Sequence, residues 1–248
     1  MDLTDALAAD GIVCAVGAGG KKTAMAALAA ASDRATVTAT VRIPKAFAER
    51  PEIHRLVETP DPAGVVGTND AWPLEVVPGP ADESRHAGYE NDVVAGLREP
   101  APGPVLVKAD GARMRQFKAP SDREPQIPAN ADTVLAIASA RAVGEPLDEE
   151  VVHRPERVAA VTDRAVGEEL RPVDVATVLA SDRGGMKRVP DGATAVAVVN
   201  MVDDERLAAV GREVAEATLA RSDRVDRVVL TRLDESRVVD VYDSSRSA

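Results

Sequence analysis

The stretch of residues 11–23, GIVCAVGAGGKKT, decides how this chain folds. Residues 12–16 are an apolar run of the length of a buried strand. Three glycines and two lysines follow, and the alanine-rich segment after Thr23 predicts a helix. A strand, a glycine-rich turn and a helix start together bring backbone N–H groups, the helix dipole and lysine charge to one point. We expect an anion there, and a nucleoside triphosphate is the natural candidate.

The stretch is close to the phosphate-binding pattern G-x-x-x-x-G-K-[ST]. If Gly20-Lys21 is the GK pair, Ala15 occupies the first glycine position and Lys22 the hydroxyl position, with Thr23 one residue late. An ordinary strand-to-helix turn is the alternative, but such a turn needs one glycine and has no use for two adjacent lysines. We therefore expect phosphate to be bound by Gly17, Ala18, Gly19, Gly20, Lys21, Lys22 and Thr23.

The composition narrows the class of protein. Hydrophobic residues make up 45% of the 248 residues and aromatic residues only 2%, so the core must consist of Val, Ala, Leu and Ile. The net charge of −11 argues against general nucleic-acid binding, which needs a basic surface. Only six of the 30 basic residues are lysines, and an acidic, lysine-poor surface is typical of a halophilic protein from a high-salt cytoplasm.

Cysteine content and hydropathy predict a cytoplasmic protein. Cys14 is the one cysteine, so no disulfide can form within the chain, as is usual in a reducing compartment. The acidic, amphipathic start MDLTDALAADG does not resemble a signal peptide. No apolar run approaches the roughly 20 residues of a membrane span, so we expect no membrane partner.

The order of strands and helices predicts a three-layer α/β fold with a mostly parallel sheet of the P-loop NTPase type. We expect residues 1–144 and 193–248 to form the nucleotide-binding core and residues 145–192 a helical insertion packed on it. Residues 59–83, rich in Pro, Gly and Asp, are expected to form loops and short strands. Strands are expected at 12–16, 35–41, 105–107, 133–138, 193–199, 227–230 and 238–242, and helices at 2–9, 86–97, 155–166, 172–179 and 204–221.

Polar residues follow two further apolar strands, at the edge where parallel sheets bind ligands. Asp110 comes just after residues 105–107, where an aspartate of a P-loop enzyme holds Mg²⁺, so we assign Lys21 and Asp110 as catalytic and Thr23 and Asp110 as metal ligands. A helix cap or turn is the alternative role of Asp110. Asn200 and Asp203 form an N-x-x-D pattern after another strand, and a carboxylate there can accept two N–H bonds from guanine. We assign both to base binding.

The loop after Asp110 is long and rich in prolines, which fix its shape. Long ordered loops in compact domains are usually functional. His153 is a candidate base or metal ligand, although a single histidine is more often structural. We expect the side of the site that takes a second substrate to be formed by Arg42, Arg113, Lys118, Glu124, His153 and Arg154.

Several motifs, in this order, resemble the YqeC family: VGAGGKKT, then ADGA followed by KAP, EP and IP, then GEPL, VHRPER and N-x-V-D. The likeness extends over residues 12–205, and the cluster at 110–128 is its most specific part. The resemblance implies a P-loop NTPase-like fold. It also implies a role as an accessory protein of selenium-dependent molybdenum hydroxylases, in maturation of a selenium-containing molybdenum cofactor, and it specifies no reaction.

Three residues depart from what the family usually shows. Lys22 stands where a threonine follows the loop lysine, Lys108 where a glutamate precedes the aspartate by two, and Met201 where N-K-x-D has its lysine. Losing an acid and gaining lysines makes the pocket more positive. We expect phosphate binding to survive these changes, whereas Mg²⁺ positioning and hydrolysis are left open.

Together these features predict a protein that binds Mg²⁺ with ATP or GTP, GTP being slightly favoured, and that acts as an NTPase in cofactor maturation. Its partners would be the nucleotide and a molybdenum hydroxylase or its cofactor. The alternative is a non-hydrolysing chaperone whose degenerate loop binds a nucleotide or a cofactor phosphate. A Rossmann dinucleotide enzyme is disfavoured because the later glycine of G-x-G-x-x-G is missing and Arg42 stands where an acidic residue is expected.

Overall fold

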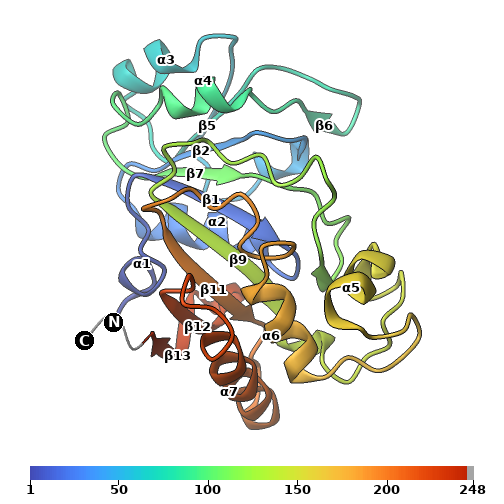
Figure 1. Cartoon of the computed structure of the whole chain (residues 1–248). Coiled ribbons are helices and arrows are strands. Elements are labelled where there is room, and N and C mark those ends of the chain that lie inside the picture. The colour runs from blue at the N-terminus through green and yellow to red at the C-terminus, as the bar shows by residue number, and fades with distance from the viewer. Residues whose placement is uncertain (245–248) are drawn as a thin grey trace.

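The fold is built on a nine-stranded sheet in the order β13-β12-β11-β9-β1-β7-β2-β5-β4, seen in a computed structural model that describes residues 1–244 (Figure 1). All neighbouring strands run parallel except β13, which is antiparallel to β12. The α/β class with a mostly parallel sheet is therefore confirmed. The strands are β1 Ile12–Gly17, β2 Thr36–Ala39, β4 Arg55–Glu58, β5 Leu74–Val77, β7 Val105–Lys108, β9 Thr133–Ser139, β11 Thr194–Asn200, β12 Arg227–Arg232 and β13 Arg237–Asp243.

Both faces of the sheet are covered, which explains why its strands are apolar at every position instead of alternating. In β1, Ile12 and Cys14 belong to the apolar cluster on one face, whereas Val13 and Ala15 belong to the cluster on the other. All four side chains are almost fully buried. Because aromatic residues are rare, the core on both faces of the sheet consists mostly of aliphatic side chains.

Helices form the two outer layers. One face is covered by α1 (Leu3–Ala6) and α2 (Lys21–Ala31), whose buried residues share a cluster with the β1 residues Val13 and Ala15. The opposite face carries α3 (Pro62–Thr68), α4 (Asn91–Ala95), α5 (Pro155–Thr162), α6 (Pro172–Ala180) and α7 (Glu205–Leu219). Figure 1 shows α6 and α7 side by side below the sheet and α3 and α4 near β5. The three-layer arrangement is therefore as expected.

Two small sheets lie at the carboxyl-terminal edge of the large one. β3 (Ile43–Pro44) pairs with β6 (Arg85–His86), and β8 (Phe117–Lys118) pairs with β10 (Val152–His153). The helix expected at 86–97 is wrong in its first part, because His86 pairs with Ile43 and Gly88 lies against the backbone of residues 40 and 41. Only α4 remains helical in that stretch.

Residues 145–192 contain β10 and the two helices α5 and α6, and the rest of this segment consists of turns and loops. Their buried residues belong to the same apolar cluster as those of β9 and α7, and α6 packs against α7. The segment therefore lies on the core, while its separate status as an insertion remains a prediction. Among residues 1–244, no helix is long and apolar enough to cross a membrane.

Candidate functional site

The glycine loop joins β1 to α2 through residues 18–20 alone. Gly17, Gly19 and Gly20 all have positive φ angles of 89°, 81° and 143°. A Cβ at Gly17 would overlap the Ile137 carbonyl oxygen, and one at Gly20 would overlap the Asn200 amide. Each glycine is therefore required both by backbone conformation and by lack of space.

The loop is shorter and more closed than the G-x-x-x-x-G-K pattern requires. Ala15 lies in the middle of β1, so no long turn precedes Lys21. The N–H of Ala18 donates to the Ile137 carbonyl at 2.8 Å, and that of Gly19 to the Arg115 carbonyl at 3.0 Å. These two N–H groups are used by the protein, so the anion cradle expected from the sequence is reduced to the start of α2.

The first turn of α2 remains open to a ligand. The backbone N–H groups of Gly20, Lys21, Lys22 and Thr23 have no acceptor among residues 1–244, as is usual for a helix start without a side-chain cap. These residues line a cleft of about 510 Å³. The positive end of the helix dipole adds to the attraction for an anion at this point.

Eight of the 20 residues that line the cleft are lysine or arginine, although the protein carries a net charge of −11. Lys22, Lys108, Arg113 and Arg115 form no ion pair with a carboxylate in the described part of the chain; the pairs found around the cleft involve other cations. Unpaired positive charge gathered at one cleft indicates an anionic ligand. The basic side chains that line it are Lys21, Lys22, Arg42, Arg85, Lys108, Arg113, Arg115 and Arg154.

Lys108 occupies an unusual position at the end of the inner strand β7. Its side chain is only 7% exposed, and its Nζ donates to the Arg42 carbonyl oxygen at 2.6 Å. Burial and the charge of Lys21 lower the pKa of Lys108 to about 7. An anion in the cleft would offset both effects and favour the charged ammonium.

A buried network of alternating charges lies beneath the cleft. Asp110 is 1% exposed, and its two oxygens contact Lys21 Nζ at 2.8 Å and Lys118 Nζ at 2.9 Å. The Gly17 N–H also donates to this carboxylate, and Lys21 Nζ donates to the Gly17 carbonyl oxygen. Burial alone would raise the pKa of Asp110, but the charges of Lys21 and Lys118 hold it below its usual range. Asp110 thus joins the glycine loop to β8.

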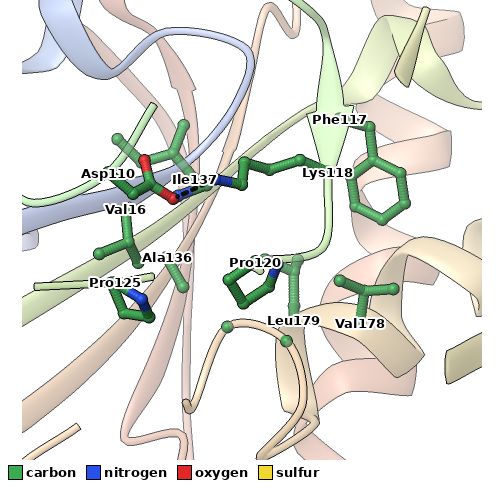
Figure 2. A pocket seen from close by; sticks show the side chains of 13 residues that line it. Val16, Asp110, Phe117, Lys118, Pro120, Pro125, Ala136, Ile137, Val178 and Leu179 are labelled. Atoms are coloured by element: carbon green, nitrogen blue, oxygen red, sulfur yellow. Dashed lines mark hydrogen bonds and ion pairs between the residues drawn. The ribbon is translucent and has the colours of Figure 1, made fainter. Parts of the chain in front are cut away.

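Figure 2 shows Lys118 extending from β8 toward Asp110 above a small cavity. The cavity measures about 20 Å³, which is room for about one water molecule. Its walls are mostly apolar and include Val16, Pro120 and Pro125. The proline frame of the loop after Asp110 therefore packs around the ion pair rather than over the cleft.

The network continues from Lys118 to the rim of the cleft. Lys118 Nζ lies 3.1 Å from Glu124, which also accepts a hydrogen bond from Arg154 at 2.6 Å. Burial opposes ionisation of Glu124, but Lys118 and Arg154 together lower its pKa to about 2. Burial and the charge of Arg154 lower the pKa of His153 to about 4, so His153 is neutral at pH 7.

The predicted Mg²⁺ ligands do not fit a divalent cation in this arrangement. Both oxygens of Asp110 are occupied by lysine ammonium groups, and a cation beside them would be repelled. Thr23 lines the cleft, whereas Asp110 lines the small cavity beneath it. Within residues 1–244, no cluster of three or more His, Cys, Asp or Glu side chains could hold a metal ion.

Four of the eight non-glycine residues with positive φ angles in the described part of the chain line the cleft. Arg113, Met114, Arg154 and Met201 all have positive φ angles, between 46° and 64°, and all four line it. Non-glycine residues rarely adopt this conformation, and such residues cluster at functional sites. The strain orients two arginines and two methionines around one space.

The structure brings most predicted site residues together. Gly19 to Thr23, Arg42, Arg113, Glu124, His153 and Arg154 line the cleft, while Gly17, Asp110 and Lys118 lie around the small cavity and Ala18 is buried. Arg85 and Arg115 were missed as site residues. Arg85 reaches the cleft because β6 pairs with β3, and the local sequence does not predict this pairing.

Asn200 and Asp203 do not line the cleft. The Asn200 amide is buried, donating to the Gly19 carbonyl at 2.9 Å and accepting from the Leu233 N–H at 3.1 Å. It therefore ties the glycine loop to the end of β12. Asp203 accepts a hydrogen bond from Arg141 at 2.6 Å and lines a separate hollow with it, so base recognition by Asp203 remains a prediction.

The chain is an α/β protein with a mostly parallel sheet and, at the carboxyl edge of this sheet, a cleft with many basic side chains. The chain belongs to the YqeC family, because the family model described as YqeC protein matches residues 13–156. It is similar to a protein of Escherichia coli (strain K12) named "Uncharacterized protein YqeC", with 26% identity over 196 residues, 76% of this chain and 75% of the relative. No solved structure matches the chain.

Proposed function

We propose that the cleft binds a nucleotide or a nucleotide-like cofactor through its phosphate groups. The observation that carries this proposal is that four N–H groups at the start of α2 and four basic side chains, all without an acceptor or carboxylate partner among residues 1–244, face one cleft. Phosphate groups satisfy both, since they accept several hydrogen bonds and carry negative charge. The volume of about 510 Å³ suits a small-molecule ligand.

Apolar side chains in the same cleft supply a place for a flat ring. Val41, Pro44, Met114 and Met201 line it, and Met114 is 80% exposed despite its apolar side chain. Methionine is flexible and makes favourable contacts with aromatic rings. A ligand with a ring at one end and phosphates at the other matches a cleft that has both apolar and basic side chains.

Between the two functions expected from the sequence, the geometry favours the non-hydrolysing binding protein. Hydrolysis would need Mg²⁺, and the residues expected to hold it do not fit. We propose that the partner is a molybdenum hydroxylase or its cofactor, an assignment supported by the family resemblance alone. Phosphate release in the presence of Mg²⁺ tests the NTPase, which stays the second candidate because Thr23 and Lys22 face the same cleft.

Titration of the protein with ATP, GTP and pyrophosphate by calorimetry tests the proposal. We expect Lys22→Ala to weaken binding of each by about tenfold, because one charge-assisted contact is lost. Arg34→Ala is the matched control, since it removes the same charge from an exposed position just beyond α2 and should leave affinity unchanged. Equal losses in the two variants, or binding of none of the three ligands, would contradict the proposal.

The same titration tests base recognition. If Asp203 reads guanine, GTP binds more tightly than ATP, and Asp203→Ala removes the difference while pyrophosphate binding is unchanged. The Asp203 side chain is 21% exposed and must release Arg141 to reach a base. Equal binding of GTP and ATP to the wild-type protein would mean that the N-x-x-D segment has only a structural role.

A further inference from the structure

We infer that the cleft takes its phosphate ligand free of divalent metal, so that Mg²⁺ competes with the protein for the ligand instead of bridging the two. This inference rests on the proposed function and specifies the ionic form of the ligand. It departs from the Mg²⁺–nucleotide complex that the sequence predicts.

The distribution of charge around the cleft carries the inference. Glu124 is the one carboxylate that lines it in the described part of the chain, and this side chain is held by Lys118 and Arg154. Asp82, on the neighbouring loop, is held by Arg85 at 2.7 Å. Asp110 lies below the cleft and is held by Lys21 and Lys118. Among residues 1–244, no carboxylate at the cleft is therefore free of a cationic partner and available to a metal ion.

Three cations that line the cleft come from different elements and can neutralise phosphate charge without a metal. Lys22 lies on the first turn of α2, and Lys108 lies at the carboxyl end of β7, the strand next to β1. Arg113 approaches from the loop after Asp110. Three separate elements thus direct ammonium or guanidinium groups into one space, and each can bind a phosphate oxygen directly.

A bound Mg²⁺ makes the ligand a poorer match to this cleft. It cancels part of the negative charge that the unpaired cations attract, and it keeps several water molecules in a rigid octahedral shell. It also brings a positive charge close to Lys108, whose pKa is already lowered by burial and by the charge of Lys21. The metal-free polyanion has none of these disadvantages.

We expect Lys108 to contribute most to the difference in affinity between the metal-free ligand and its Mg²⁺ complex. Lys108 is 7% exposed, has no carboxylate partner among residues 1–244, and its pKa is lowered by burial and by the charges of Lys21 and Lys118. Lys108→Met removes the charge and retains an unbranched apolar side chain of similar length. We expect this variant to lose metal-free binding most and to discriminate less between the two forms.

The test uses pyrophosphate as the probe, titrated into the full-length protein by calorimetry in EDTA and in excess MgCl₂. Ionic strength is matched with NaCl, so that screening does not differ between the two conditions. We expect wild-type affinity to fall by about tenfold in MgCl₂, which corresponds to loss of about one charge-assisted contact. The fall should be smaller in Lys108→Met and unchanged in the control Arg34→Ala. Thermal unfolding of each variant, followed by circular dichroism, verifies that it is folded.

Two results would overturn the inference. Equal or tighter binding in MgCl₂ would show that the cleft accepts the metal complex, and the proposed function would stand without this refinement. The loss of affinity in MgCl₂ could also be reduced equally in Arg34→Ala and in Lys108→Met. That result would assign the effect to overall charge and not to the cleft. Absence of pyrophosphate binding in both conditions would instead remove the proposed function itself.

Discussion

Replacement of Asp110 by alanine is expected to lower the free energy of unfolding by about 3–5 kcal/mol, the usual cost of breaking a buried ion pair. The carboxylate is 1% exposed and contacts the Nζ atoms of Lys21 and Lys118 at 2.8 and 2.9 Å. Without it, two buried ammonium groups lose their main counter-charge, and the Gly17 N–H loses its acceptor. Most of the loss in the free energy of unfolding comes from leaving these buried polar groups without partners, and less comes from the lost contacts themselves.

Urea denaturation followed by circular dichroism measures the effect. Asp122→Ala is the matched control, because Asp122 pairs with Arg157 at 3.0 Å on the surface, where its side chain is 87% exposed. Exposed pairs contribute little, so the control should unfold at nearly the wild-type urea concentration. If Asp110→Ala were no less stable than the control, the ion pairs of Asp110 would not hold the glycine loop.

Replacement of Glu75 by glutamine is expected to stabilise the protein at alkaline pH by up to about 5 kcal/mol. Glu75 lies on the inner strand β5 and is 0% exposed, and neither oxygen has a hydrogen-bond partner in the described residues. Burial raises the pKa of Glu75 from 4.5 to about 8. Because the folded state holds the proton more tightly than the unfolded state, wild-type stability falls as pH rises from about 4.5 to 8.

Urea denaturation at several pH values between 5 and 8.5 tests this expectation. Glutamine has nearly the shape of the protonated acid and does not ionise, so the stability of Glu75→Gln should lack this component of the pH dependence. The two proteins should be most alike near the acidic end of the range. Glu99→Gln, at an exposed position, should follow the wild-type curve. Parallel curves for wild type and Glu75→Gln would mean that Glu75 ionises freely in the folded protein.

The sequence predicts those features that depend on local pattern. The apolar runs of β1, β7, β9 and β11 appear at their expected positions, and the glycines after β1 mark the start of α2. The placement of Arg42 and Arg113 near that start also follows, because parallel strands bring their carboxyl ends to one edge, whereas Arg154 arrives from the small sheet of β8 and β10. Fold class and the main members of the cleft could therefore be inferred before the structure.

Features that depend on long-range packing could not be inferred. Glu75 lies in LEVV, which reads as a short apolar piece, and nothing local shows that its carboxyl has no partner. The role of Asn200 in tying the glycine loop to β12 requires knowledge of which strands are neighbours. The pairing of Asp110 with two lysines depends on Lys118, which arrives from a different small sheet.

The cleft is assembled from segments that are far apart in the chain, from Gly19 near one end to Met201 near the other. The unfolded chain has no such site, so a ligand of the cleft binds the folded state alone and raises the temperature of unfolding with the logarithm of its concentration above the dissociation constant. Proteases degrade mainly the unfolded chain. If the cleft binds its proposed ligand, the supply of that ligand in a cell would lengthen the life of each molecule, and the abundance of the protein would follow the availability of what it binds.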